Sequence, residues 1–239
     1  MNLTIGLSYA PSGVAKYQYY IVALRHAASK QHDELEMIDL SSDPSAIELV
    51  DGVLFTGGVD IDPARFGKES ERDMCEIDEN RDANEFRIAE RADERGLPIF
   101  GICRGLQMLN VHYGGTLITN LSPEDLALHS KSGQSDRRHN IHIEAGTLLK
   151  RATRRTESNV TSAHHQGIEN VAPGMKVSAR SSNDGIIEAI EWEDQTTKPF
   201  FLAVQWHPER MGFDEPLAGE LFEQFISEVA LHKIISARK

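Results

Sequence analysis

The chain has 239 residues, 40% of them hydrophobic and 26% charged, which is enough apolar side-chain surface for one large globular domain. Its formal net charge of −12 argues against a protein that binds nucleic acid or an anionic membrane surface. Two cysteines and the lack of any apolar run of about 20 residues exclude a disulfide scaffold and a membrane-spanning helix, so a cytoplasmic protein that acts on a small molecule is expected.

The first half of the chain alternates between short apolar runs, which predict strands, and segments with helical periodicity. In order, these are a strand at 3–7, a helix near 17–30, strands at 35–40 and 52–58, a helix near 79–95, a strand at 97–102 and a helix from 104. Such alternation predicts βαβ units, which build a parallel sheet with helices on both faces.

The second half is richer in strands. They are expected at 140–146, 175–181, 186–192 and 200–206, before an amphipathic helix within 216–236. Because little helix separates these strands, they predict antiparallel additions to the sheet. The sequence thus predicts an α/β fold that forms a single domain over 1–239. The polar segment 122–139 is expected to be a surface loop or a mobile lid.

Cys103 lies where the strand at 97–102 passes into the helix from 104. In open α/β sheets the carboxyl ends of the strands line the ligand crevice, and a helix start favours a thiolate. Gly101 and Gly105 flank the cysteine as glycines flank the nucleophile of a strand–turn–helix elbow. We therefore predict a nucleophilic thiol, with a small buried hydrophobic side chain as the alternative.

A thiol nucleophile needs a base, and the base needs a carboxylate that orients it. His207 follows the last apolar strand, on the same sheet edge as Cys103 if the two strands are parallel. Pro208 biases His207 away from helix, which can turn Glu209 back toward the imidazole. Cys103, His207 and Glu209 are therefore the predicted catalytic residues.

An oxyanion needs backbone N–H donors at a glycine turn or a helix start. Gly57 and Gly58 end the strand expected at 52–58, where the backbone can approach a ligand closely. We predict that the N–H groups of Gly58 and Arg104 form the oxyanion hole and that Gly57 contacts substrate. Taken alone, a Gly-Gly pair after a strand is more often a turn.

Six segments in chain order resemble the class I glutamine amidotransferase superfamily, and within it the γ-glutamyl-γ-aminobutyrate hydrolase type of the cysteine peptidase C26 family. They are FTGGVDIDP, RDANE, GICRGLQMLNVHYGGTL, TSAHHQG, DGIIEAIE and VQWHPE. The resemblance implies a flavodoxin-like three-layer sandwich with a mostly parallel central sheet. It also implies a triad of Cys103, His207 and Glu209, with Gly58 and Arg104 at the oxyanion.

The resemblance further implies substrate contacts from Gln107, His165 and Gln166. The alternatives are a helix-packing amide for Gln107 and a polar loop for the other two. For DENRDANE at 78–85, helix capping is at least as well supported as substrate contact.

The expected activity is hydrolysis of a γ-glutamyl amide, such as γ-glutamyl-γ-aminobutyrate in polyamine catabolism, through a cysteine thioester that releases glutamate. No cofactor and no metal are expected, the partner is a small γ-glutamyl molecule, and a homodimer is compatible with the sequence. The leaving amine stays open, because the charged segment KQHDELEMIDL at 30–40 departs from the family pattern.

Three alternatives remain open. One is a glutaminase subunit that delivers ammonia to a separate synthase, and another is a non-enzymatic module that has kept the fold. The third is a metal site, which the lack of an HExxH spacing weakens. Its candidate ligands are His139, His142, His164, His165 and His207.

Overall fold

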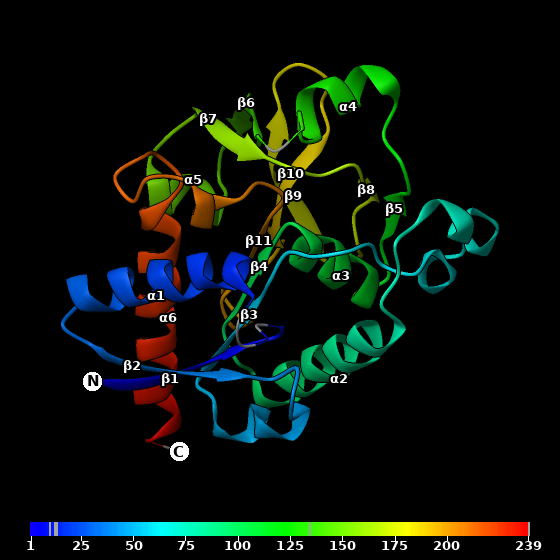
Figure 1. Ribbon diagram of the computed structural model, residues 1–239. Coiled ribbons are helices and arrows are strands. Elements are labelled where there is room, and N and C mark those ends of the chain that lie inside the picture. The colour runs from blue at the N-terminus through cyan, green and yellow to red at the C-terminus, as the bar shows by residue number, and fades with distance from the viewer. Residues whose placement is uncertain (10, 12–13, 134, 239) are drawn as a thin grey trace.

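The computed structural model describes residues 1–9, 11, 14–133 and 135–238. Within these ranges the strands join into one sheet in the order β2-β1-β3-β4-β11-β10-β9-β6-β7, with β8 beside β10 and β5 beside β8 (Figure 1). None of the helices in these ranges has the length and apolar composition needed to cross a lipid bilayer.

Five parallel strands form one end of the sheet, from its edge strand β2 to β11. They are β1 (Asn2–Leu7), β2 (Glu34–Asp39), β3 (Gly52–Phe55), β4 (Ile99–Ile102) and β11 (Phe201–Val204). The order β2-β1-β3-β4 with helical crossovers is the flavodoxin-like arrangement, so the expected fold class is confirmed.

The remaining strands pair antiparallel, as the strand-rich second half predicts. They are β5 (Thr116–Ile118), β6 (Arg137–Ile143), β7 (Glu157–Ser162), β8 (Gly167–Asn170), β9 (Met175–Ser181) and β10 (Ile187–Trp192).

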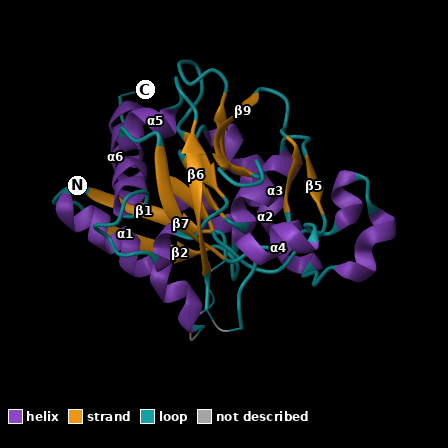
Figure 2. Ribbon diagram, turned by 90° about the horizontal axis from the view of Figure 1, so that it is seen from above, coloured by secondary structure: helices purple, strands orange, loops and turns teal. Residues whose placement is uncertain are grey.

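Helices cover both faces of the parallel strands (Figure 2). α1 (Gln18–Lys30) and α6 (Gly219–Ser236) pack together on one face, and α2 (Glu79–Arg95) and α3 (Arg104–His112) on the other. Shorter helices are α4 (Pro123–His129) and α5 (Leu148–Thr153), with 3-10 turns η1 (Ala15–Tyr17), η2 (Pro44–Leu49), η3 (Pro63–Phe66), η4 (Glu69–Met74) and η5 (Pro208–Arg210).

Side-chain alternation along the central strands creates two separate apolar cores. In β4, Phe100 packs into the core shared with α1 and α6, whereas its neighbour Ile99 packs into the core shared with α2 and α3. Because both faces are buried, these strands are apolar throughout instead of alternating with polar residues.

The segment 122–139 differs from the expected loop. Ser122 caps α4 by accepting from the Asp125 N–H at 3.2 Å, Pro123 occupies the first helical turn, and His129 at the end of the helix is fully buried. β6 then begins at Arg137. The prediction of a continuous polar loop is wrong because the short helix is stabilised by burial that composition does not reveal.

Close packing of α3 against the strand ends depends on Gly105. A Cβ atom at this position would lie 2.3 Å from the backbone oxygen of Phe55, which is closer than any side chain allows. The glycine therefore lets α3 start directly behind β3 and β4, and this packing sets where Cys103 is held.

We predict that Gly105→Ala destabilises the fold by about 1–3 kcal/mol, because backbone must move to admit the methyl group. Thermal unfolding measures the effect. Gly167→Ala is the matched control, since a Cβ there would meet its nearest atoms at 3.5 Å, an ordinary contact. Equal melting temperatures for the two variants would contradict this account of the packing.

Candidate active site

Cys103 occupies a sharp bend between β4 and α3. Its backbone has a positive φ of 55° with ψ −106°, a conformation that costs a non-glycine residue about 1–3 kcal/mol. The Cys103 N–H donates to the carbonyl of Val204 at 2.7 Å, and β4 runs parallel to β11 with Ile102 opposite Val204. The two strand ends therefore meet at the edge where the sequence places the thiol and the histidine.

His207 lies three residues after the end of β11, and hydrogen bonds to a strand and to a carboxylate fix its position. Its backbone N–H donates to the carbonyl of Thr161 at 2.9 Å. Its ring Nδ1 lies 2.7 Å from Oε1 of Glu209, which η5 turns back toward the ring. Because an ionised carboxylate only accepts, Nδ1 carries a proton and donates it, which leaves Nε2 for the thiol.

Charge on both sides of the ring sets its proton affinity. Burial lowers the pKa of His207, but the negative charges of Glu209 and of the Cys103 thiolate outweigh it and raise the pKa to about 9. Burial raises the pKa of Glu209, yet attraction to His207 lowers it below its ordinary value overall. The arrangement favours an imidazolium beside the carboxylate of Glu209.

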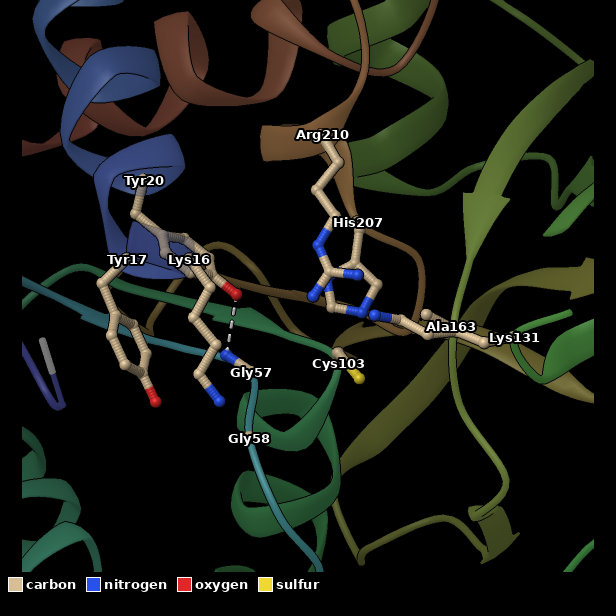
Figure 3. Close-up of a pocket in the computed structure, with 10 residues that line it drawn as sticks. All are labelled: Lys16, Tyr17, Tyr20, Gly57, Gly58, Cys103, Lys131, Ala163, His207 and Arg210. Carbon is tan, nitrogen blue, oxygen red and sulfur yellow. Dashed lines mark hydrogen bonds between the residues drawn. The ribbon is translucent and has the colours of Figure 1, made fainter. Parts of the chain in front are cut away.

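A cavity of about 190 Å³ opens beside the thiol (Figure 3). Cys103 and His207 line it, while Glu209 lies behind the histidine and is 3% exposed. The remaining lining residues are Lys16, Tyr17, Tyr20, Gly57, Gly58, Lys131, Ala163 and Arg210.

The glycine turn is fixed from two directions. The Gly57 N–H donates to the hydroxyl oxygen of Tyr20 at 3.0 Å, and the Gly57 carbonyl accepts from Nη2 of Arg81 at 3.1 Å. In a trans peptide the N–H points opposite the carbonyl, so Arg81 turns the Gly58 N–H away from itself. Within the described ranges, neither this N–H nor that of Arg104 has a hydrogen-bond partner in the protein.

Arg81 belongs to a buried charge network below the turn. Its Nε lies 3.1 Å from Glu85, while the side chain of Arg104 pairs with Asp82 at 2.5 Å and also with Glu85. These side chains are at most 2% exposed, so the Arg104 side chain is directed into the protein. In the segment DENRDANE at 78–85, Asp78 caps α2 by accepting a hydrogen bond from the Arg81 N–H at 3.0 Å.

The other predicted substrate contacts lie outside the cavity lining. Gln107 donates its amide to the Gln166 carbonyl at 3.1 Å and to Gln205 at 3.2 Å, as the helix-packing alternative requires. His165 pairs with Asp60 at 3.1 Å, and Gln166 is 1% exposed. Contact of these three residues with substrate stays a prediction.

Three cations at the cavity were missed by the sequence analysis. Lys16 precedes α1, Lys131 follows α4, and Arg210 is the next residue after the predicted triad. Arg210 directly follows His207, Pro208 and Glu209, and this position could have indicated that it lies at the cavity. Lys16 could have been found because the chain approaches the cavity from the carboxyl end of β1. Nothing in the local pattern indicates Lys131, because its place depends on how the segment after α4 packs.

The histidines considered as a single metal site have separate surroundings. His207 is bound to Glu209, His165 to Asp60, and His142 is exposed on β6. Only His139 and His164 share a partner, the buried Glu188.

Comparison with known proteins identifies the family and the fold. Residues 36–209 match the family model of Peptidase C26. A "putative glutamine amidotransferase" of Mycobacterium tuberculosis is 39% identical over 72% of this chain, which spans 55% of that relative's length. The γ-glutamyl-γ-aminobutyrate hydrolase PuuD of Escherichia coli is 34% identical over 80% of this chain and 78% of its own. The glutaminase domain of Trypanosoma brucei CTPS shares the fold, with a TM-score of 0.68 at 15% identity over 96% and 94% of the two chains.

We predict that Glu209→Gln lowers the pKa of His207, because it removes the nearest negative charge. In the wild-type protein, the stability gained from the raised pKa is fully present below the ordinary value of 6.5 and is lost as the pH rises through about 9. NMR titration of the histidine ring measures the pKa directly. Glu215→Gln, which removes a surface carboxylate paired with Arg138, is the control, and identical His207 titrations in both variants would refute the assignment.

Proposed function

This chain belongs to the peptidase C26 family, and we propose that it hydrolyses the γ-glutamyl amide bond of a small anionic conjugate such as γ-glutamyl-γ-aminobutyrate. One observation carries the proposal. A thiol on a strand–helix bend of positive φ shares a cavity with a carboxylate-bound imidazole and with Gly58, and the N–H groups of Gly58 and of Arg104, the residue after the thiol, have no hydrogen-bond partner among the described residues. This combination suits acyl transfer.

In the proposed first step, the Cys103 thiolate attacks the γ-carbonyl carbon and forms a C–S bond. The imidazolium of His207 gives its proton to the leaving amine nitrogen as the C–N bond breaks, which leaves a γ-glutamyl thioester. The neutral imidazole then takes a proton from water. The resulting hydroxide attacks the thioester, the thiolate departs and glutamate is released.

Negative charge on the carbonyl oxygen in each step would be met by the N–H groups of Gly58 and Arg104. Donors that are placed before reaction need no reorganisation, and each such donor contributes about 3–4 kcal/mol in comparable acyl-transfer enzymes. The network of Arg81, Glu85 and Arg104 supports this role, because it holds the turn and the helix start together from below.

The cations around the thiol support an anionic substrate. Lys16 and Lys131 reach the cavity from opposite sides of Cys103 in Figure 3, and Arg210 lies next to His207. A γ-glutamyl conjugate of an amino acid carries one carboxylate at each end and the scissile amide between them. Three cationic side chains at the cavity of a chain of net charge −12 favour a substrate with two carboxylates. Cytoplasmic location and a part in polyamine breakdown stay predictions.

We predict that Cys103→Ala lowers the turnover of γ-glutamyl-γ-aminobutyrate by roughly 10⁴-fold or more while the melting temperature changes little, because the nucleophile is lost. Glutamate release measures the rate. Cys75→Ala is the control for the other thiol, whose pKa burial raises to about 11, and it should keep full activity. Turnover by Cys103→Ala at the wild-type rate would refute the mechanism.

Free glutamine in the same assay separates the proposal from the glutaminase-subunit alternative. A free hydrolase releases glutamate from the conjugate faster than from glutamine without any added protein. Release from glutamine alone, or only after a synthase is added, would support the alternative instead.

Lys131→Gln tests the charge argument. We predict about a tenfold loss in kcat/KM for γ-glutamyl-γ-aminobutyrate and a smaller loss for glutamine, whose leaving group has no carboxylate; tenfold corresponds to about 1.4 kcal/mol. Lys150→Gln removes a lysine that does not line the cavity and serves as control. Equal losses for the two substrates would show that Lys131 does not bind the leaving group.

A further inference from the structure

Three histidines surround one buried carboxylate beside the active-site cavity. His129 ends α4, His139 lies in β6, His164 follows β7, and Glu188 lies in β10. All four side chains are at most 1% exposed. The proposed hydrolysis uses none of them.

The polar atoms of this cluster are spaced as the ligands of a small ion. His129 Nδ1, His164 Nε2 and Glu188 Oε1 form a triangle with sides of 3.2, 3.3 and 3.5 Å. His139 Nε2 lies 3.2 Å from the same carboxylate oxygen. Tetrahedral Zn²⁺ with bonds of about 2.0–2.1 Å places its ligand atoms about 3.3 Å apart.

Outer hydrogen bonds turn ring lone pairs into the cluster. His129 Nε2 lies 2.8 Å from the carboxylate of Asp184, and His164 Nδ1 lies 2.9 Å from the Gln166 carbonyl. Both partners are acceptors, so these nitrogens carry the protons. The other nitrogen of each neutral ring then points a lone pair inward, as in metal-binding histidines that donate to a carboxylate or carbonyl.

The cluster also contains polar atoms that the protein does not satisfy. Across the described residues, neither oxygen of Glu188 and neither ring nitrogen of His139 has a hydrogen bond, although His139 Nε2 is within contact distance of the carboxylate. A buried carboxylate needs positive charge or donors beside it, and a cation bound among the three imidazole rings would supply the charge.

We propose that His129, His139, His164 and Glu188 bind one divalent transition-metal ion, best matched by Zn²⁺. Imidazole nitrogens with one carboxylate suit Zn²⁺, and four protein ligands leave no open position, so the ion is structural. Only His139 and His164 belong to the set that the sequence suggested. The ion is separate from the thiol chemistry.

Its place in the fold gives the ion a role in shaping the cavity. Lys131 follows His129 by two residues and Ala163 directly precedes His164, and both line the cavity. The ion would join α4, β6, β10 and the segment after β7, and so hold that wall in place.

Metal content of the wild-type protein, purified without chelator, is the first test. We expect about one Zn²⁺ per chain, and visible absorption bands of tetrahedral Co²⁺ when the chelated protein takes up cobalt. Saturating Zn²⁺ should raise the melting temperature of the chelated protein by roughly 5–10 °C.

A proton shared between His129 and His164 would explain the same distances without metal. Chelated wild-type protein that binds neither ion in titration calorimetry would establish that alternative and overturn the proposal.

Variants identify the ligands. Glu188→Gln keeps the shape of the side chain and should lower Zn²⁺ affinity by at least tenfold. His142→Ala changes an exposed histidine on the same strand as His139 and should bind as wild type does. If Glu188→Gln does not fold, His139→Gln takes its place in the titration. The ion would have to bind elsewhere if the Glu188 or His139 variant bound Zn²⁺ with wild-type affinity. The same would follow if His142→Ala lost as much Zn²⁺ affinity as the ligand variant.

Discussion

The candidate active site depends on one backbone constraint, the positive φ of Cys103 where β4 becomes α3. That bend directs the thiol out of the sheet and leaves the next N–H at the free start of a helix. It persists because its neighbours fix it. The Cys103 N–H is bound to β11, and Gly105 allows α3 to approach Phe55. Strain of this kind is maintained only where the surrounding structure over-determines the conformation.

The buried ion pairs fix the positions of the strand ends more than they stabilise the fold. Removing ion pairs from water costs about as much as their attraction returns, so the pairs of Arg81 with Glu85 and of Arg104 with Asp82 are weak sources of folding free energy. Their geometric effect is larger. Arg81 binds the carbonyls of Thr56 and Gly57 on one strand end, while Arg104 belongs to the next, so the network fixes the spacing between the two ends.

The local pattern of apolar and polar residues was sufficient to predict a helix or strand wherever burial of one or two of its faces determines its sequence. The continuous apolar run of β4 and the periodic charges of α2 lie as predicted, and the motifs at Cys103 and His207 lead to neighbouring strand ends. Short elements such as β5 and β8 were missed, because their pairing partners are distant in sequence. The placement of Lys131 was missed for the same reason, since tertiary packing decides whether a side chain faces a cavity.

The parallel pair β4–β11 also governs when the enzyme can first exist. During synthesis, β4 is made early and would present an open strand edge until the far later β11 inserts beside it. Contacts between such distant segments form slowly, because a long loop must close first. The nascent chain therefore carries Cys103 without His207 beside it until the last quarter of the chain has been made, and the proposed pair of thiol and imidazole can form only after that point.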